Sequence, residues 1–317
     1  MTTRERRYGV ELTNLDEPLS PLAGATKRDL VDYLDEIADY LLPALADRPL
    51  TVLRVLRGQR PFMQKNTPKY TPEWVPTVTI WAESSQRQVR YPLCNDRRTL
   101  LWLANQRAVE YHPALGLADN IYRPTHLVLD LDPPDDDFAK VVAVAQLVRQ
   151  TLDDHGLVGA VKTSGAKGLH VFVPVADTGA DDVAAATRAL AARAAALDPA
   201  IATTAYIKTD RAGKVFVDST RAGGATVVAA YSPRLRPGLP VSFPLDWADL
   251  DTVTPGDFTV YTAVDAAAER PSWEQLMAPP QRLPEELIEF GHTIPVARVA
   301  AMHEGRRRAR ARRQAGD

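Results

Sequence analysis

The chain has 317 residues and a net charge of −2, with 45% of its residues hydrophobic and 25% charged. This balance is typical of a globular protein with a large core, in one domain or two packed modules, and it excludes a disordered or fibrous chain. The single cysteine, Cys94, excludes an intrachain disulfide and a cysteine-based zinc site. Neither a signal peptide nor an apolar stretch of about 18 residues occurs, so we expect a cytoplasmic protein without a membrane span.

Helical and strand patterns alternate in the first part of the chain. Residues 26–46 repeat apolar side chains at helical spacing behind Thr26, which is a suitable N-cap, and they predict an amphipathic helix. Residues 50–56 alternate in the way that a strand does, and residues 75–81 are rich in β-branched side chains. Residues 97–110 predict a second helix.

The second part of the chain has a different order of elements. A strand over 125–134, ended by two prolines, is followed by a helix over 135–156. The elements expected after these are strands at 157–163 and 169–175, a helix at 180–196, and strands at 214–218 and 225–232. The order β-α-β-β-α-β is the split β-α-β arrangement of ferredoxin-like and RNA-recognition-type (RRM-like) sheets.

These patterns predict an α+β protein in three parts. Residues 1–115 form an N-terminal α/β module, residues 116–295 form an RRM-like module packed on it, and residues 296–317 form a basic tail. Six arginines fall in the eight positions from Arg306 to Arg313 with no apolar neighbour, so we expect that tail to be disordered.

Charge is distributed unevenly along the chain. Eleven Lys or Arg but only three Asp or Glu lie between Arg48 and Arg107, whereas five aspartates lie between Asp130 and Asp137. A basic stretch beside an acidic cluster suits a protein that follows a phosphate backbone and also holds divalent metal. Two solvated loops of opposite charge would produce the same pattern.

Asp130 and Asp132 are the strongest chemical signal. Residues i and i+2 of a strand point to the same face, so both carboxylates project side by side from the end of an apolar strand. Asp218 ends another short apolar strand, and if the two strands are neighbours the three carboxylates could hold two Mg²⁺ or Mn²⁺ ions about 3.5–4 Å apart. Asp218 could instead be an ordinary turn residue.

The segment KTSGAKGLH, residues 162–170, lies between two predicted strands. Gly165 and Gly168 allow a tight turn with uncovered N–H groups, and Ser164 and Lys167 add a hydroxyl and a positive charge. Such a turn can bind phosphate or a ribose, although it is not a Walker A motif. A plain hairpin turn with an exposed lysine is the alternative, and His170 by itself is ambiguous.

Taken together, LVLDLDPP, KTSGAKGLHVFVP, KVFVDSTRAGGATVVAAYSPRLRPG and RPFMQKNTP resemble the ligase-D polymerase family of the archaeo-eukaryotic primase superfamily. The resemblance runs from about residue 8 to 290. It implies a primase-like fold and a template-dependent nucleotidyltransferase of the cytoplasm and nucleoid that extends or gap-fills DNA ends in repair. It also implies NTP or dNTP substrates, with ribonucleotides preferred, and two metal ions, with manganese favoured.

The resemblance also assigns roles to individual residues. The catalytic metal ligands would be Asp130, Asp132 and Asp218. The incoming nucleotide would be bound by His112, Ser164, Gly165, Lys167, Gly168, His170, Arg221 and Arg234. DNA would be bound by Phe62 and Met63 through stacking, by Lys27, and by the basic stretch with Arg54, Arg57 and Lys65.

Three features depart from the family. Met63 replaces the second of two aromatic residues, and Glu17 stands where end-joining members carry a lysine that helps to recognise a 5′-phosphate. No K-x-D-G adenylation motif occurs, so we expect no nick sealing by this chain. Two other functions remain open: a DNA-end-binding module that has lost catalysis and recruits a separate ligase or a Ku-like partner, and a metal-dependent phosphohydrolase.

Overall fold

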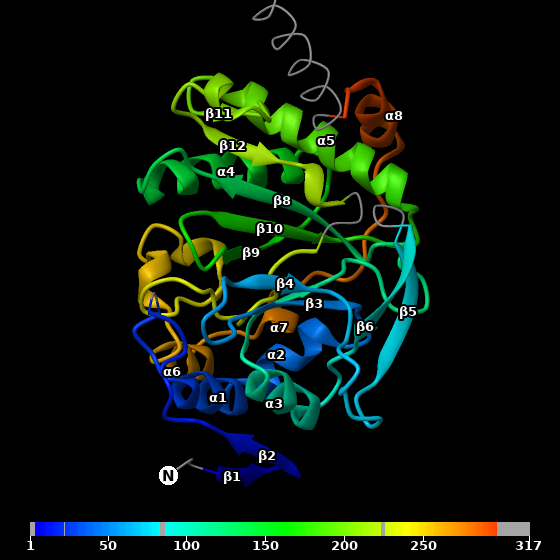
Figure 1. Ribbon diagram of the computed structural model, residues 1–317. Coiled ribbons are helices and arrows are strands. Elements are labelled where there is room, and N and C mark those ends of the chain that lie inside the picture. The colour runs from blue at the N-terminus through cyan, green and yellow to red at the C-terminus, as the bar shows by residue number, and fades with distance from the viewer. Residues whose placement is uncertain (1–3, 22, 83–85, 223–225, 297–317) are drawn as a thin grey trace, which may run out of the picture.

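A computed structural model describes residues 4–21, 23–82, 86–222 and 226–296 (Figure 1). One continuous core of buried apolar side chains runs through both parts of the chain. The expected boundary near residue 115 falls between two strands that both contribute to this core, so the division into modules stays a prediction. None of the helices in the described part combines the length and apolar character that a bilayer crossing requires.

The N-terminal part combines three helices with small sheets. Its helices are α1 (Lys27–Glu36), α2 (Ala38–Leu45) and α3 (Arg97–Asn105). Its strands are β1 (Arg4–Arg7) paired with β2 (Val10–Thr13), a sheet of β4 (Phe62–Gln64), β3 (Leu50–Arg54) and β7 (Ala108–Pro113) in that order, and a hairpin of β5 (Thr77–Ala82) and β6 (Arg87–Pro92). Strand β4 lies at the edge of its sheet, which leaves one side of it open to solvent.

The larger sheet contains the three aspartates that are predicted to bind metal. Its strand order is β11 (Ala202–Thr203), β12 (Val215–Asp218), β8 (His126–Asp132), β10 (Leu169–Pro174), β9 (Ala160–Thr163) and β13 (Pro244–Leu245). Helices α4 (Phe138–Asp153) and α5 (Ala180–Leu197) pack against each other and against β8 (Figure 1). Along the chain the four central strands are β8, β9, β10 and β12, with α4 between β8 and β9 and α5 between β10 and β12. Their order in the sheet is β12-β8-β10-β9, which confirms the split β-α-β arrangement.

The last helices of the described part of the chain are short. They are α6 (Ala263–Ala268), α7 (Trp273–Leu276) and α8 (Glu285–Thr293). Helix α8 packs closely on α5, because Gly291 lies against the backbone of Ala185 with no room for a side chain. Except for Val296, the expected tail lies outside the described residues.

Three expected elements differ from the structure. The helix over 26–46 begins at its Thr26 cap but divides at Ile37 into α1 and α2, and Pro43 lies inside α2 without an N–H to donate. The helix over 97–110 stops at Asn105, because Arg107 has a left-handed φ of +62°, and β7 follows. In the expected strand over 225–232, the described residues 226–232 form a single β-bridge, at Thr226, and the backbone turns at Tyr231, where φ is +64°.

Candidate active site

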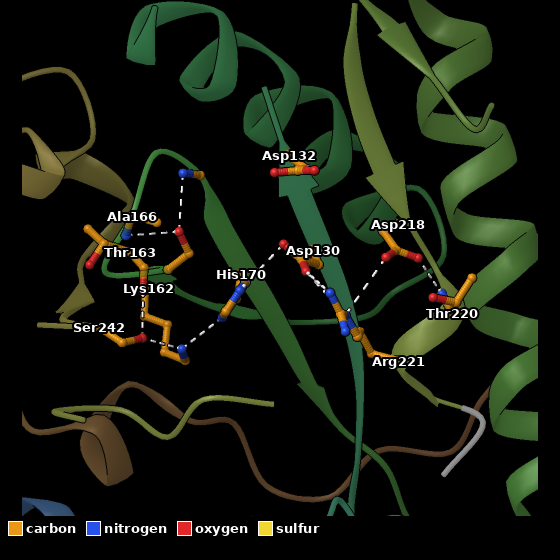
Figure 2. Close-up of polar contacts among 12 residues, drawn as sticks. Asp130, Asp132, Lys162, Thr163, Ala166, His170, Asp218, Thr220, Arg221 and Ser242 are labelled. Atoms are coloured by element: carbon orange, nitrogen blue, oxygen red, sulfur yellow. Dashed lines mark hydrogen bonds and ion pairs between the residues drawn. The ribbon is translucent and has the colours of Figure 1, made fainter. Parts of the chain in front are cut away.

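Four polar side chains form a row across the larger sheet. Asp218 of β12 is opposite Asp130 of β8, Asp130 is opposite His170 of β10, and His170 is opposite Lys162 of β9. Directly opposed residues of antiparallel strands point to the same face, so the row follows from the strand register. Figure 2 shows Asp130 between His170 and Asp218.

Asp130 is the most strongly held carboxylate of the row. Its Oδ2 accepts hydrogen bonds from Nε and Nη2 of Arg221 at 3.2 and 3.0 Å, and its Oδ1 lies 3.4 Å from Nε2 of His170. Burial alone would raise the pKa of Asp130, but His170 and Arg221 outweigh it and hold that pKa well below its usual range. Asp130 is therefore ionised at neutral pH, facing two donors.

Of the other two carboxylates, Asp218 shares Arg221 with Asp130, and Asp132 has a different partner. Asp218 accepts a hydrogen bond from the Thr220 backbone N–H at 2.8 Å, and its Oδ2 lies 3.8 Å from Arg221 Nε. Asp132 lies beyond the row, where its Oδ2 accepts from Arg211 Nη1 at 3.3 Å (Figure 2). The expected proximity of Asp218 to Asp130 is thus present, whereas Asp132 is turned toward a different arginine.

Among the described residues, no group of three or more His, Cys, Asp or Glu side chains converges closely enough to hold a metal ion. The positive charge beside Asp130 and Asp218 comes from Arg221, and beside Asp132 it comes from Arg211. The donor set nevertheless fits Mg²⁺ or Mn²⁺, because three carboxylates supply the hard oxygen ligands that these ions prefer. For a cation to bind there, these two guanidinium groups would have to move away.

The turn over residues 164–168 is built by its glycines. The hydroxyl of Ser164 accepts from the backbone N–H groups of Ala166 and Gly168, at 3.3 and 3.2 Å. Gly165 has a φ of +66°, and a Cβ there would come within 2.6 Å of Arg234 Cγ. A Cβ on Gly168 would lie 2.0 Å from the carbonyl oxygen of Leu131 in β8. The exposed Lys167 pairs with Asp136 at 2.5 Å.

Glu110 joins two of the predicted nucleotide-binding residues. Its Oε2 lies 2.8 Å from Nε2 of His112 and forms an ion pair, at 3.1 Å, with Nε of Arg234. Its Oε1 accepts from the backbone N–H of Leu235 at 2.9 Å. Burial would raise the pKa of Glu110, but these partners lower it to about 2. Burial also lowers the pKa of His112, against the opposing effect of Glu110.

One cavity of about 480 Å³ contains most of the predicted site. The predicted residues that line it are His112, Asp130, Asp132, Ser164, His170, Asp218, Arg221 and Arg234. Tyr206, Lys208, Arg211, Phe216 and Arg236 also line it, among others. The cavity therefore has carboxylates on one wall and several cationic side chains around them.

The predicted nucleic-acid-binding residues fall into two groups. Lys27 and Arg54 are buried: Lys27 donates to Thr13 O and Asn105 Oδ1, both at 2.6 Å, and Arg54 donates to the Gln106 carbonyl at 2.8 Å. Burial lowers the pKa of Lys27 to about 8. Phe62, Met63 and Lys65 are exposed on or beside the edge strand β4, and Arg57 is 87% exposed.

Several residues of the site were not anticipated from the sequence. Glu110 precedes His112 by two positions in one strand, so the same-face argument used for Asp130 and Asp132 would have paired them. Arg211, which stacks over Phe216 at 4.0 Å and pairs with Asp132, lies outside every predicted element. Lys162 begins the quoted turn segment but was given no role.

Comparisons with known proteins agree with the family resemblance of the sequence. The family described as LigD, primase-polymerase domain matches residues 26–273. The chain is 33% identical over 263 residues to a bifunctional non-homologous end joining protein LigD of Bacillus subtilis, covering 81% of this chain and 42% of that protein. It is 38% identical over 259 residues to the multifunctional non-homologous end joining DNA repair protein LigD of Mycobacterium tuberculosis, covering 76% of this chain and 33% of that protein.

A solved structure shares the fold. The polymerase domain from Mycobacterium tuberculosis ligase D, in complex with DNA, superposes with a TM-score of 0.76 at 33% identity, covering 85% of this chain and 97% of that one. The expected archaeo-eukaryotic primase-like α+β fold is thereby confirmed. The chain spans less than half the length of these curated relatives.

Proposed function

This chain belongs to the family of LigD primase-polymerase domains, and on that premise we propose that it extends the 3′ ends of DNA as a template-dependent nucleotidyltransferase. The polymerase domain it resembles was solved with DNA, and its LigD relatives are named for non-homologous end joining, which supports a role in filling gaps at breaks. Broken or gapped template-primer DNA is the proposed partner, with a Ku-like protein and a separate DNA ligase as further partners.

The observation that carries this proposal is the division of charge within the one cavity. Asp130, Asp132 and Asp218 form its acidic part, and arginine, lysine and histidine side chains complete it. A nucleoside triphosphate with divalent metal has matching chemistry, because its phosphates need cations and its metal needs carboxylates. A cavity of about 480 Å³ is large enough for such a ligand.

In the proposed reaction, the primer 3′-hydroxyl attacks the α-phosphate of a nucleotide paired with the template, and pyrophosphate leaves. Asp130, Asp132 and Asp218 would hold two divalent cations, Mn²⁺ or Mg²⁺, which activate the hydroxyl and stabilise the charge of the in-line transition state. His112 and Arg234, both oriented by Glu110, bind the triphosphate. If cations took the place of Arg221 beside Asp130, the Arg221 guanidinium would be able to bind phosphate through two parallel hydrogen bonds.

The remaining assignments concern the turn and the DNA. Ser164, Gly165, Lys167 and Gly168 bind phosphate and sugar, and a contact from Ser164 or His170 to the 2′-hydroxyl would favour ribonucleotides. Phe62 and Met63 stack on the template, and Arg57 and Lys65 follow its backbone. Lys27 and Arg54 are buried, so we propose that they support the DNA-binding surface from beneath and do not contact DNA themselves.

Primer extension on a gapped duplex tests the proposal. The purified chain is given each NTP or dNTP, with Mn²⁺ or Mg²⁺, on a gap with or without a 5′-phosphate. We expect templated addition, faster with NTPs and Mn²⁺, and a loss of at least about a thousandfold in Asp130→Ala, as for other catalytic carboxylates.

Each of the other outcomes would indicate a different function. Tight DNA binding with no incorporation under any metal would indicate the end-binding module. Release of phosphate without primer growth would indicate a phosphohydrolase. Full extension by Asp130→Ala would show that the carboxylate row is not the catalytic centre.

A further inference from the structure

Lys162 is a buried cation-forming group that the proposed reaction does not use. It lies at one end of the row described above and is fully buried. Its Nζ contacts two side chains, Ser242 Oγ at 2.5 Å and His170 Nδ1 at 2.9 Å (Figure 2). Burial, and then the charge of Arg234, lower the pKa of Lys162 well below its usual range. Lys162 does not line the cavity, so contact with a substrate does not account for the burial of its amine.

The direction of each hydrogen bond around Lys162 can be worked out. The Ser242 hydroxyl donates its only proton to the Thr163 carbonyl oxygen, at 2.7 Å, so it can only accept from Lys162. A neutral lysine amine has two protons, and the second one is then available for His170 Nδ1. A charged amine has three protons and no lone pair, so it would also donate. A charged Lys162 is therefore a donor toward His170, and a neutral Lys162 is a donor unless its lone pair accepts a proton from Nδ1.

The far side of His170 agrees with this direction. With Nδ1 accepting from Lys162, the proton of the neutral imidazole is on Nε2, which lies 3.4 Å from Asp130 Oδ1. The other tautomer would place an Nε2 lone pair against an ionised carboxylate and would require Lys162 to accept. Both neighbours of His170 therefore favour the same tautomer.

We propose that Lys162 is a positioning residue of the polymerase site, holding His170 as the Nε2–H tautomer so that His170 fixes the orientation of the Asp130 carboxylate. Lys162 acts through His170, and Ser242 holds Lys162 in turn. With Oδ1 of Asp130 set by His170, Oδ2 stays directed toward Arg221, or toward a cation that takes its place. The inference rests on the proposed function for its kinetic consequence but not for the tautomer itself.

Nitrogen-15 NMR of histidine in the whole chain tests the tautomer without any reaction. The signals of His170 are assigned by their loss in His170→Gln. In the wild type we expect a pyrrole-type Nε2 and a pyridine-type Nδ1. In Lys162→Met, which keeps the length and loses both donors, we expect the population of the Nε2–H form to fall below that of the wild type, because only Asp130 then favours it. A wild-type His170 protonated on Nδ1 would overturn the proposal, even if Lys162→Met did not fold.

Kinetics tests the consequence. In Lys162→Met we expect kcat for extension to fall about 10- to 100-fold, the usual effect of removing an outer orienting group. We expect the nucleotide KM to stay within about twofold, because orientation of a reacting group acts on kcat. Lys162→Gln keeps an N–H donor and should recover part of kcat, and Ser242→Ala should lose less than Lys162→Met.

Lys140→Met, which removes a half-buried lysine of α4 that pairs with Asp135, is the matched control and should extend primers as the wild type does. An active wild type together with an equally active Lys162→Met would refute the positioning role. An inactive wild type would count against the proposed polymerase function, and the NMR result would still decide the tautomer.

Discussion

The active-site cavity and the N-terminal surface formed by Arg57, Phe62, Met63 and Lys65 present their functional side chains in opposite ways. In the cavity, most of the carboxylates, histidines and arginines are buried or half-buried and are held by neighbours, as Asp130 is by Arg221 and His170, and only Asp132 among the three carboxylates is exposed. On the N-terminal surface the side chains are exposed, and Arg57 has only a distant pair with Glu17, at 3.7 Å. Changes in the cavity should therefore spread to neighbours, while changes on the surface should act singly.

The largest effect that distinguishes the two regions should come from Glu110→Gln. The loss of this charge leaves His112 and Arg234 without the group that orients them, and breaking such a buried pair costs about 2 kcal/mol or more. We expect the nucleotide KM to rise at least about 30-fold, because about 1.4 kcal/mol corresponds to a factor of ten. Steady-state extension at varied nucleotide concentration measures this.

Glu110 also predicts a pH dependence of stability. Because its pKa is lowered from 4.5 to about 2 in the folded state, its contribution is complete above pH 4.5 and is lost as the pH falls toward 2. The stability gap between wild type and Glu110→Gln, from urea unfolding, should therefore narrow over that range. A gap that stays constant with pH would contradict the pairing, and exposed Glu73→Gln serves as the control.

A smaller effect should come from Phe62→Ala on the N-terminal surface. Base stacking on an aromatic side chain is worth about 1–3 kcal/mol, so we expect template-primer affinity to fall about 5- to 150-fold with the nucleotide KM unchanged. Met63→Phe, which restores the family's second aromatic residue, should tighten DNA binding. Fluorescence anisotropy with labelled gapped DNA measures both.

Phe290→Ala is the matched control, because Phe290 is an exposed aromatic residue on α8, away from this surface (Figure 1). A rise in nucleotide KM in Phe62→Ala as large as that of Glu110→Gln would remove the distinction between the two regions.

The smallest effect should come from Glu17→Lys. Glu17 lies 3.7 Å from both Arg57 and Arg107, so its carboxylate offsets two cations that would otherwise attract phosphate. We expect the variant to prefer a 5′-phosphorylated gap by a few-fold more than the wild type, and stability to change by less than about 1 kcal/mol because the pairs are partly exposed. Glu17→Gln separates loss of the negative charge from gain of the positive one, and an unchanged preference in both variants would mean that this position does not contact the 5′ end.

Local pattern was enough to predict the four central strands of the larger sheet, but not its two-residue edge strands β11 and β13. The apolar run before Asp130 and the acids and glycine around α4 each specify one element, and the β-α-β-β-α-β order then allows few arrangements. Strand β7 was missed because the helical pattern of residues 97–105 continues through residue 110, and only the left-handed turn at Arg107 ends it. Strand β4 has only three residues, and β6 is rich in polar side chains, so periodicity identifies neither of them.

The site was predictable where it follows from strand geometry. Asp130 and Asp218 came together because they occupy opposed positions in neighbouring strands, as assumed. Two features could be seen only in the three-dimensional structure. Arg221 and Arg211 form ion pairs with the carboxylates. Lys27 and Arg54 are buried. Counting the charges of the basic stretch does not show which of these side chains the fold uses for its own hydrogen bonds.

Gly168 links the turn to the catalytic strand. Because an added Cβ would lie 2.0 Å from the Leu131 carbonyl, the turn and the end of β8 are in direct backbone contact. Even alanine at position 168 would push apart the two elements that carry Ser164 and Asp132. If a nucleotide binds the turn as proposed, a shift of the turn would for the same reason move the end of β8, and a spectroscopic probe placed on either element would report on the other.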